Sequence, residues 1–208
     1  MEPEDLELRL RRKLEQADHA GAATLALGAY GAEIFGFLLA FHRDSDDASE
    51  VFSLFSERLW RDLPGFRGDS SFRTWAYALA RHASLNYRRD ARRRGGRLES
   101  LPDDSGHAAF AQKVRSETAS YLRSQAKARF AALRESLPSE DQALLILRVD
   151  RGLSWNDLAL VLHEGGAPLG DAGRKREAAR LRKRFQLLKA RLLELGRGAG
   201  VVSGKDER

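Results

Sequence analysis

Apolar residues recur along this chain at intervals of three and four positions, which is the period of an amphipathic α-helix. No segment keeps the alternating apolar and polar pattern of a β-strand. In the first half of the chain, helices are expected over residues 6–17, 22–41, 46–62 and 72–94. In the second half they are expected over residues 108–135, from Pro138 to the turn at Gly152, over 155–163 and from 174 to about 195. The sequence therefore predicts an all-α fold.

Runs of Gly, Pro and small polar residues divide these helices into two groups. Pro64 and Gly65 end the helix 46–62, and residues 95–107 form the clearest linker. The weakly amphipathic helix 6–17 is expected to be a loosely attached extension. The expected organisation is two small helical domains joined by a flexible linker: an N-terminal extension (1–21), a first domain (22–97), a linker with a polar helix (98–129), a second domain (130–195) and a tail (196–208).

The last two expected helices have the layout of a helix-turn-helix. A short helix follows Ser154, which is a favourable capping residue, and a Gly-containing connection over 164–173 leads to a long helix. That long helix has apolar residues in steps of three and four and basic residues on its other face. A helix-turn-helix inserts its second helix into the major groove of DNA. An ordinary helical hairpin or a short coiled coil would show a similar pattern.

Basic charge is confined to two short stretches. Residues 80–97 hold seven Arg and one acid, and residues 174–191 hold nine Lys or Arg and one acid. The whole chain has a net charge of only +6, so the remainder is net acidic. Cations concentrated at two places favour contacts with a polyanion such as nucleic acid. Solvation of two helix faces is the simpler alternative.

Several other classes of function are disfavoured by the residue inventory. The chain has no cysteine, which excludes disulfides and thiolate metal sites and fits a reducing compartment. Its five histidines are scattered, with no pair at metal-ligand spacing. Residues 68–70 lack the flanking glycine of a serine-protease signature, and there is no phosphate-binding loop. We expect no enzymatic activity, no metal and no cofactor.

The same inventory gives an expectation for location. No apolar run is expected to approach the roughly 20 residues that span a bilayer. Residues 1–5 are acidic and do not have the layout of a signal peptide. We therefore expect a cytoplasmic protein without membrane insertion.

Two segments resemble parts of one known family. Residues 63–81, LPGFRGDSSFRTWAYALAR, look like the promoter-melting segment of bacterial RNA polymerase sigma factors of the extracytoplasmic-function (ECF) type, within the sigma-70 family. Leu137-Pro138, LILR at 145–148 and GLSWNDLA at 152–159 look like the opening of region 4. Residues 28–97 and 130–195 thus resemble regions 2 and 4 in the family order.

The resemblance implies a subunit that binds core polymerase, directs it to promoters and assists DNA opening. The implied partners are promoter DNA and the polymerase core, through the clamp of the β′ subunit and the flap of the β subunit. An anti-sigma factor is a further implied partner.

The resemblance also implies three groups of contact residues. Those for the −10 element and the separated strand are Arg67, Asp69, Ser70, Ser71, Arg73, Arg81, His82, Leu85, Asn86, Arg88 and Arg89, with Arg92 to Arg94 on phosphates. Those for the −35 element are Arg174, Lys175, Arg176, Arg180, Lys183 and Arg184. Those for polymerase are Asp47, Glu50, Ser53, Leu54, Glu57, Arg58 and Trp60.

The chain departs from the family pattern at three places. Ser53 and Leu54 stand where relatives have a Gln followed by an acid, and His82 replaces a common Asn. The last helix opens with RKREAAR instead of a Val-Lys-Ser-Arg motif. The first departure leaves open a sigma-like DNA-binding regulator that no longer engages polymerase. A helical protein whose basic helices bind acidic partners is the third alternative.

Overall fold

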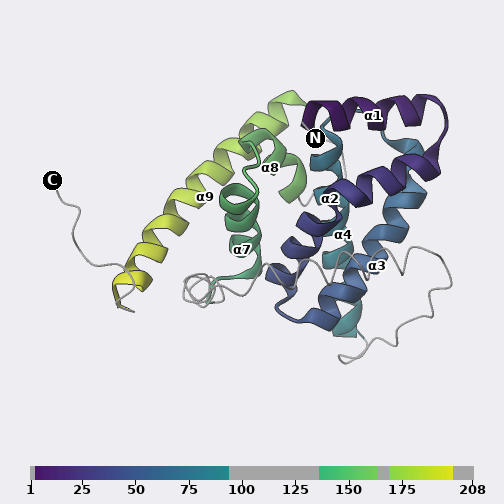
Figure 1. Ribbon diagram of the computed structural model, residues 1–208. Helices are drawn as coiled ribbons and strands as arrows, with labels where there is room; N and C mark the ends of the chain where they lie inside the picture. The colour runs from purple at the N-terminus through teal and green to yellow at the C-terminus, as the bar shows by residue number, and fades with distance from the viewer. Residues whose placement is uncertain (1–2, 94–135, 164–168, 199–208) are drawn as a thin grey trace. The chain divides into compact units, whose positions relative to one another are not determined.

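The computed structural model describes residues 3–93, 136–163 and 169–198, which belong to two compact units (Figure 1). Every regular element within these ranges is a helix, so the predicted all-α fold class is confirmed. The expected linker 95–107 and helix 108–135 lie outside the described residues. The domain boundaries predicted inside them stay predictions.

The first unit is built from α1 (Pro3–Glu15), α2 (His19–His42), α3 (Ser45–Asp62), the 3-10 turn η1 (Leu63–Gly65) and α4 (Phe72–Arg93). α3 packs against both α2 and α4, and α2 also contacts α4. Their apolar stripes meet in one core, as the helical periodicity predicts. The large side chains that are almost fully buried there include Ile34, Phe37, Leu38, Phe52, Phe55, Leu59, Phe72 and Tyr77.

Local capping sets the starts of α2 and α3. The Asp18 side chain accepts a hydrogen bond from the Gly21 N–H, and Asp44 accepts from the N–H groups of Asp46 and Asp47. Arg43, between α2 and Asp44, has a φ of 64° and ends α2 in the left-handed conformation. The break expected between the helices 22–41 and 46–62 is confirmed.

The N-terminal helix α1 is an integral part of the first unit, and the expectation of a loosely attached extension is wrong. Leu6 and Leu10 are 6% and 1% exposed, and α1 packs against α2. In Figure 1 it lies at the end of the bundle where α4 begins. Two buried leucines one turn apart are a narrow stripe, which is why the sequence pattern looked weak.

Helix α2 corrects a second expectation. By length and composition it could cross a membrane, since it has 24 residues and contains an 18-residue stretch of mean hydropathy 1.6. Its large apolar residues are separated by Ala and Gly, so the sequence shows no unbroken run of large apolar side chains. Because Ala and Gly carry no charge, the helix as a whole is still apolar. In the fold, 56% of that 18-residue stretch is buried, as in the core helix of a globular unit.

The second unit contains α7 (Ser139–Leu145), the π-helical turn η2 (Ile146–Asp150), α8 (Trp155–Leu162) and α9 (Asp171–Gly198). Gly152 makes the predicted turn with a φ of +68°, and the Ser154 side chain caps α8 by accepting from the Asp157 N–H. α9 packs on α7 and α8, with Ala178, Leu181 and Leu188 buried. α9 begins at Asp171, three residues earlier than expected.

Candidate nucleic-acid interface

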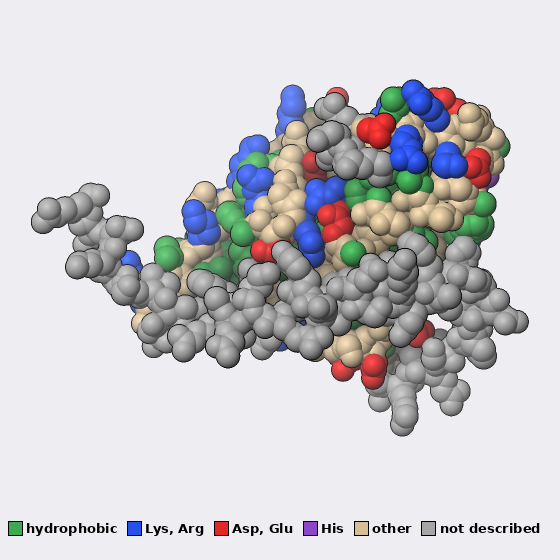
Figure 2. All heavy atoms as spheres, in the orientation of Figure 1, with side chains coloured by type: hydrophobic (Ala, Val, Ile, Leu, Met, Phe, Trp, Pro, Cys, Tyr) green, Lys and Arg blue, Asp and Glu red, His purple; other side chains and the backbone are tan. Residues whose placement is uncertain are grey.

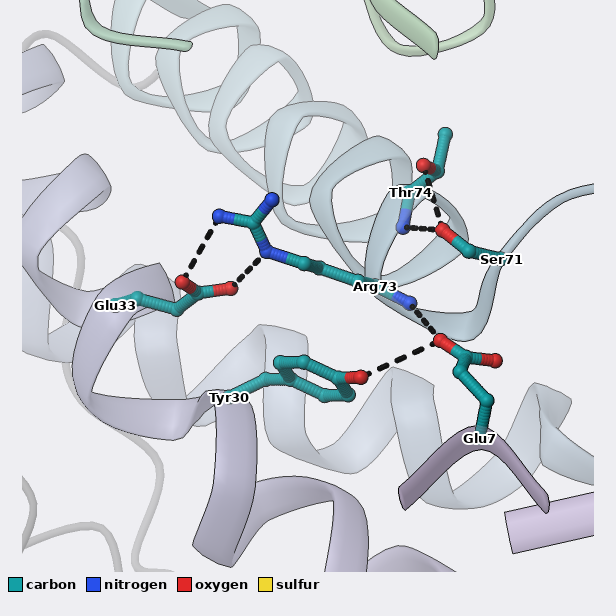
Figure 3. Close-up of polar contacts among 6 residues, drawn as sticks. All are labelled: Glu7, Tyr30, Glu33, Ser71, Arg73 and Thr74. Carbon is teal, nitrogen blue, oxygen red and sulfur yellow. Dashed lines mark hydrogen bonds and ion pairs between the residues drawn. The ribbon is translucent and has the colours of Figure 1, made fainter. Parts of the chain in front are cut away.

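The loop 66–71 leads into the first turn of α4, and that turn is capped from two directions (Figure 3). The Ser71 Oγ accepts the Thr74 N–H at 3.1 Å and so caps the turn locally. From α1, the Glu7 carboxylate accepts the Phe72 N–H at 3.0 Å and the Arg73 N–H at 3.3 Å. The first N–H groups of a helix have no partner within it, and a carboxylate there also interacts favourably with the positive end of the helix dipole.

Arg73 is committed to an ion pair on the surface of α2. Its Nε and one terminal nitrogen donate to the two Glu33 carboxylate oxygens at 2.7 and 3.1 Å, and its guanidinium lies 5.6 Å from the Tyr77 ring centroid. Burial alone would lower the pKa of Arg73, but the hydrogen bond and charge of Glu33 raise it above the ordinary value. The geometry therefore assigns this arginine to holding α4 on α2.

Aromatic rings pack beneath the same turn. The Phe66 ring lies 5.3 Å from Phe72 and 5.2 Å from Trp75, measured between centroids. Phe72 has no exposed surface, whereas Trp75 is partly exposed. Phe72 therefore belongs to the core, and the cluster ties the start of the loop to α4.

Polar loop residues remain open to solvent. Arg67, Asp69 and Ser71 are exposed, and Ser70 is partly exposed. The Ser70 hydroxyl donates to the Ser71 carbonyl at 3.1 Å. Gly68 has a φ of +76°, a conformation that side chains with a Cβ rarely adopt, so it fixes the course of the loop.

Further along α4, the candidates divide between surface and core. Arg81 has no exposed surface, so the expectation that its side chain faces DNA is wrong. His82 and Arg89 are exposed, and Arg89 donates to the Asn86 side chain at 3.2 Å. The Arg88 guanidinium covers the Phe41 ring, and the Leu85 side chain is partly buried. The side chains of residues 92–94 lie outside the described ones.

One face of α3 holds exposed apolar side chains. Leu54 and Trp60 are each 38% exposed, and Glu57 is also exposed. The other polymerase-contact candidates are engaged within the unit. Asp47 accepts a hydrogen bond from the Tyr87 hydroxyl at 2.6 Å, and the Ser53 hydroxyl donates to the Ser49 carbonyl at 3.2 Å. Arg58 Nε pairs with Asp62 at 3.4 Å, and Glu50 is partly buried.

Along α9, basic side chains gather on the face visible in Figure 2. Lys175, Arg176 and Lys183 are exposed. Arg180 is exposed but pairs with Glu177 one turn earlier, at 2.6 Å, and its hydrogen bond lowers the pKa of that carboxyl group. Arg174 is partly buried.

Two other arginines of α9 hold the second unit together. Arg184 Nε donates to Asp141 Oδ1 of α7 at 2.6 Å. Arg182 lies 5.8 Å from the Trp155 ring centroid, and Arg148 lies 4.7 Å from it. Cations over an aromatic face are attracted by its quadrupole. The sequence predicted DNA contact for Arg184, whereas the structure places its charge between two helices of the unit.

Sequence reasoning missed Glu7 and Glu33, the two carboxylates that organise the start of α4. They lie 65 and 40 residues before their partners Phe72 and Arg73, so no local spacing links them. Within the described ranges, no group of three or more His, Asp or Glu side chains could hold a metal ion.

Comparison with known proteins gives a family match for the first unit. Residues 27–94 match sigma-70 region 2, which covers α2 from Leu27 onward, α3 and α4. The sigma-H factor of RNA polymerase from Pseudomonas aeruginosa is 28% identical over 158 residues, 74% of this chain and 81% of the relative. The sigma factor YlaC of Bacillus subtilis is 28% identical over 166 residues, 78% of this chain and 90% of the relative.

A third relative, the ECF sigma-E factor of Haemophilus influenzae, is 25% identical over 156 residues, covering 74% of this chain and 82% of the relative. These alignments are longer than the span 27–94, so the similarity extends beyond region 2. Together with the all-helical fold, they show that the chain contains a sigma-70 region 2 and is similar over 74–78% of its length to RNA polymerase sigma factors, one of them of the ECF group.

Proposed function

We propose that this chain is a promoter-specificity subunit that directs core RNA polymerase to its promoters and assists DNA opening. The observation that supports this most directly is the start of α4, where an exposed polar loop is attached to a rigidly capped basic helix. A base displaced from a duplex needs polar edge contacts beside a stacking surface. Loop 66–71 with the partly exposed Trp75 has both.

The −10 and melting contacts proposed here are fewer than the sequence alone implied. Arg67, Asp69, Ser70 and Ser71 supply the loop, and His82, Asn86, Arg88 and Arg89 supply the outer face of α4. Arg81 is excluded by its burial, and Arg73 acts through its ion pair with Glu33. The exposed arginines neutralise phosphates, so DNA binding weakens as salt rises.

The second unit is proposed to read the −35 element by inserting α9 into the major groove. The exposed residues Lys175, Arg176, Arg180 and Lys183 make the contacts, and Arg174 lies nearest the entering end. Arg184 supports them indirectly by keeping α9 on α7. These assignments follow from exposure and charge on the second helix of a helix-turn-helix.

Polymerase binding is proposed for the α3 face around Leu54, Glu57 and Trp60, directed at the β′ clamp. Exposed apolar side chains with a charged rim are typical of the centre of a protein interface. The flap of the β subunit is the proposed partner of the second unit, and an anti-sigma factor is a further proposed partner. The protein is proposed to work in the cytoplasm and to catalyse no reaction itself.

In vitro transcription with purified core polymerase tests the proposal. The chain should co-elute with core and support initiation at promoters that its overexpression activates. Leu54→Asp should weaken core binding about tenfold, since a charge would be buried in the interface. Leu8→Asp, at an exposed leucine of α1, is the matched control and should bind normally.

The competing functions give different results. A sigma-like regulator would bind DNA without core and would initiate nothing. A protein that binds acidic partners through its basic helices would show no promoter preference. Either result would refute the proposed function.

A further inference from the structure

Glu7 is a side chain of α1 that reaches the start of α4. It lies outside residues 27–94, the span that matches region 2. Its Oε2 accepts the Phe72 N–H at 3.0 Å. Its Oε1 accepts the Arg73 N–H at 3.3 Å (Figure 3). A carboxylate that bonds two backbone amides of a helix start makes charge-assisted bonds, which are stronger than neutral ones.

The position of Glu7 is itself fixed. Leu6 and Leu10 bury α1 against the unit, and the Tyr30 hydroxyl donates to Glu7 Oε1 at 3.3 Å. Burial and then the negative charge of Glu7 raise the pKa of Tyr30, so that hydroxyl stays a donor. A side chain held by a neighbouring hydroxyl and a packed helix is a rigid cap.

The cap also constrains the loop that precedes it. Phe72 is the first residue of α4, directly after Ser71, so fixing its amide fixes where the loop 66–71 ends. The other end is tied to the same turn, because the Phe66 ring packs on Phe72 and Trp75. Both ends of the loop therefore depend on the first turn of α4.

We propose that Glu7 is a positioning residue for promoter opening, which holds loop 66–71 ready to receive the displaced strand. This rests on the proposed function as a sigma factor. A preorganised loop loses less conformational entropy when it captures a base, so removing the cap slows strand capture rather than duplex binding. A purely structural role would instead lower every activity of the first unit together.

The experiment uses complete holoenzyme and a promoter mapped by overexpression, on two templates. One is fully paired, and the other carries a non-complementary −10 bubble that is already open. Glu7→Gln keeps the side-chain shape and one acceptor oxygen, and Glu7→Ala removes both acceptors. Glu15→Ala, at an exposed glutamate of the same helix, is the matched control.

On the paired template, Glu7→Ala should form open complexes about five- to tenfold less well, as expected for loss of a helix cap. Glu7→Gln should fall between it and wild type, and Glu15→Ala should match wild type. On the open bubble, whose separated strand must still be captured by the loop, Glu7→Ala should show a similar loss, whereas closed-complex formation on duplex DNA and affinity for core should be equal in all four proteins.

Normal opening by Glu7→Ala on the paired template would overturn the inference. Loss of closed-complex formation or of core affinity by Glu7→Gln would also overturn it, because that result means general damage to the unit. Wild-type protein that initiates on neither template would instead refute the proposed function.

Discussion

Arg184 of α9 and Asp141 of α7 form an ion pair in which Nε lies 2.6 Å from Oδ1, with 34% and 17% of the two side chains exposed. The pair joins residues 43 positions apart and ties the long basic helix α9 to α7. A basic residue of the helix proposed to read DNA thus helps to hold that helix on its own unit.

Arg184→Ala should therefore lower the stability of the second unit. We expect a loss of about 1 kcal/mol, since the pair is partly exposed and solvent screens part of its energy. Denaturant unfolding of the full chain, followed by Trp155 fluorescence in a variant lacking the other tryptophans, measures it. Asp141→Asn should give a similar loss, and an unchanged midpoint in both variants would contradict the assignment.

Arg180→Ala should act on DNA binding and leave stability nearly unchanged. Arg180 is exposed, and its partner Glu177 lies on the same helix, so a pair of this kind contributes only tenths of a kcal/mol. Loss of one phosphate contact should reduce the slope of log affinity against log salt by about 1. Affinity titrations with upstream promoter DNA test this, with Arg197→Ala at the far end of α9 as the control.

Arg73→Ala should impair DNA opening while leaving closed-complex formation largely intact. Since Arg73 pairs with Glu33, we expect Glu33→Gln to cause the same defect, and the double variant to be no worse than either single one. Permanganate footprinting reports the opened bases. If Glu33→Gln opens promoters normally while Arg73→Ala does not, the arginine contacts DNA directly.

Stability should fall in mild acid because of His42. Burial lowers the pKa of His42 from 6.5 to about 4, although the charge of Asp47 acts in the opposite direction. Between these two values the unfolded chain binds the proton and the folded chain does not, so stability is lost as the pH falls from 6.5 towards about 4 and is constant above 6.5. Urea unfolding across this range should be less pH-dependent in His42→Phe, and identical profiles would exclude this histidine.

The helices could be predicted from the sequence because their signals are local. The apolar steps of α9 lie within one segment, and Asp44 and Ser154 cap helices that begin at the next residue. The RGDSSF loop could likewise be placed, because its turn residues and the helix after it are contiguous.

The roles of individual charges could not be predicted, since they depend on partners distant in sequence. Arg81 sits in a basic stretch, yet it shares a helical stripe with Tyr77 and Ser84, which are both fully buried. Glu7 belonged to a helix whose two buried leucines gave too weak a pattern to show that it packs. A residue type indicates which groups a side chain can bind, whereas the fold determines which of those groups lie within its reach.

Helix α2 has a consequence for how the chain is made. The ribosome releases its 24 residues before α3 and α4, which cover much of its surface. During that interval the nascent chain presents a helix that is long and apolar enough to cross a membrane, by length and composition. Packing of α3 and α4 on α2 therefore removes from solvent an apolar surface that the growing chain exposes until those helices form.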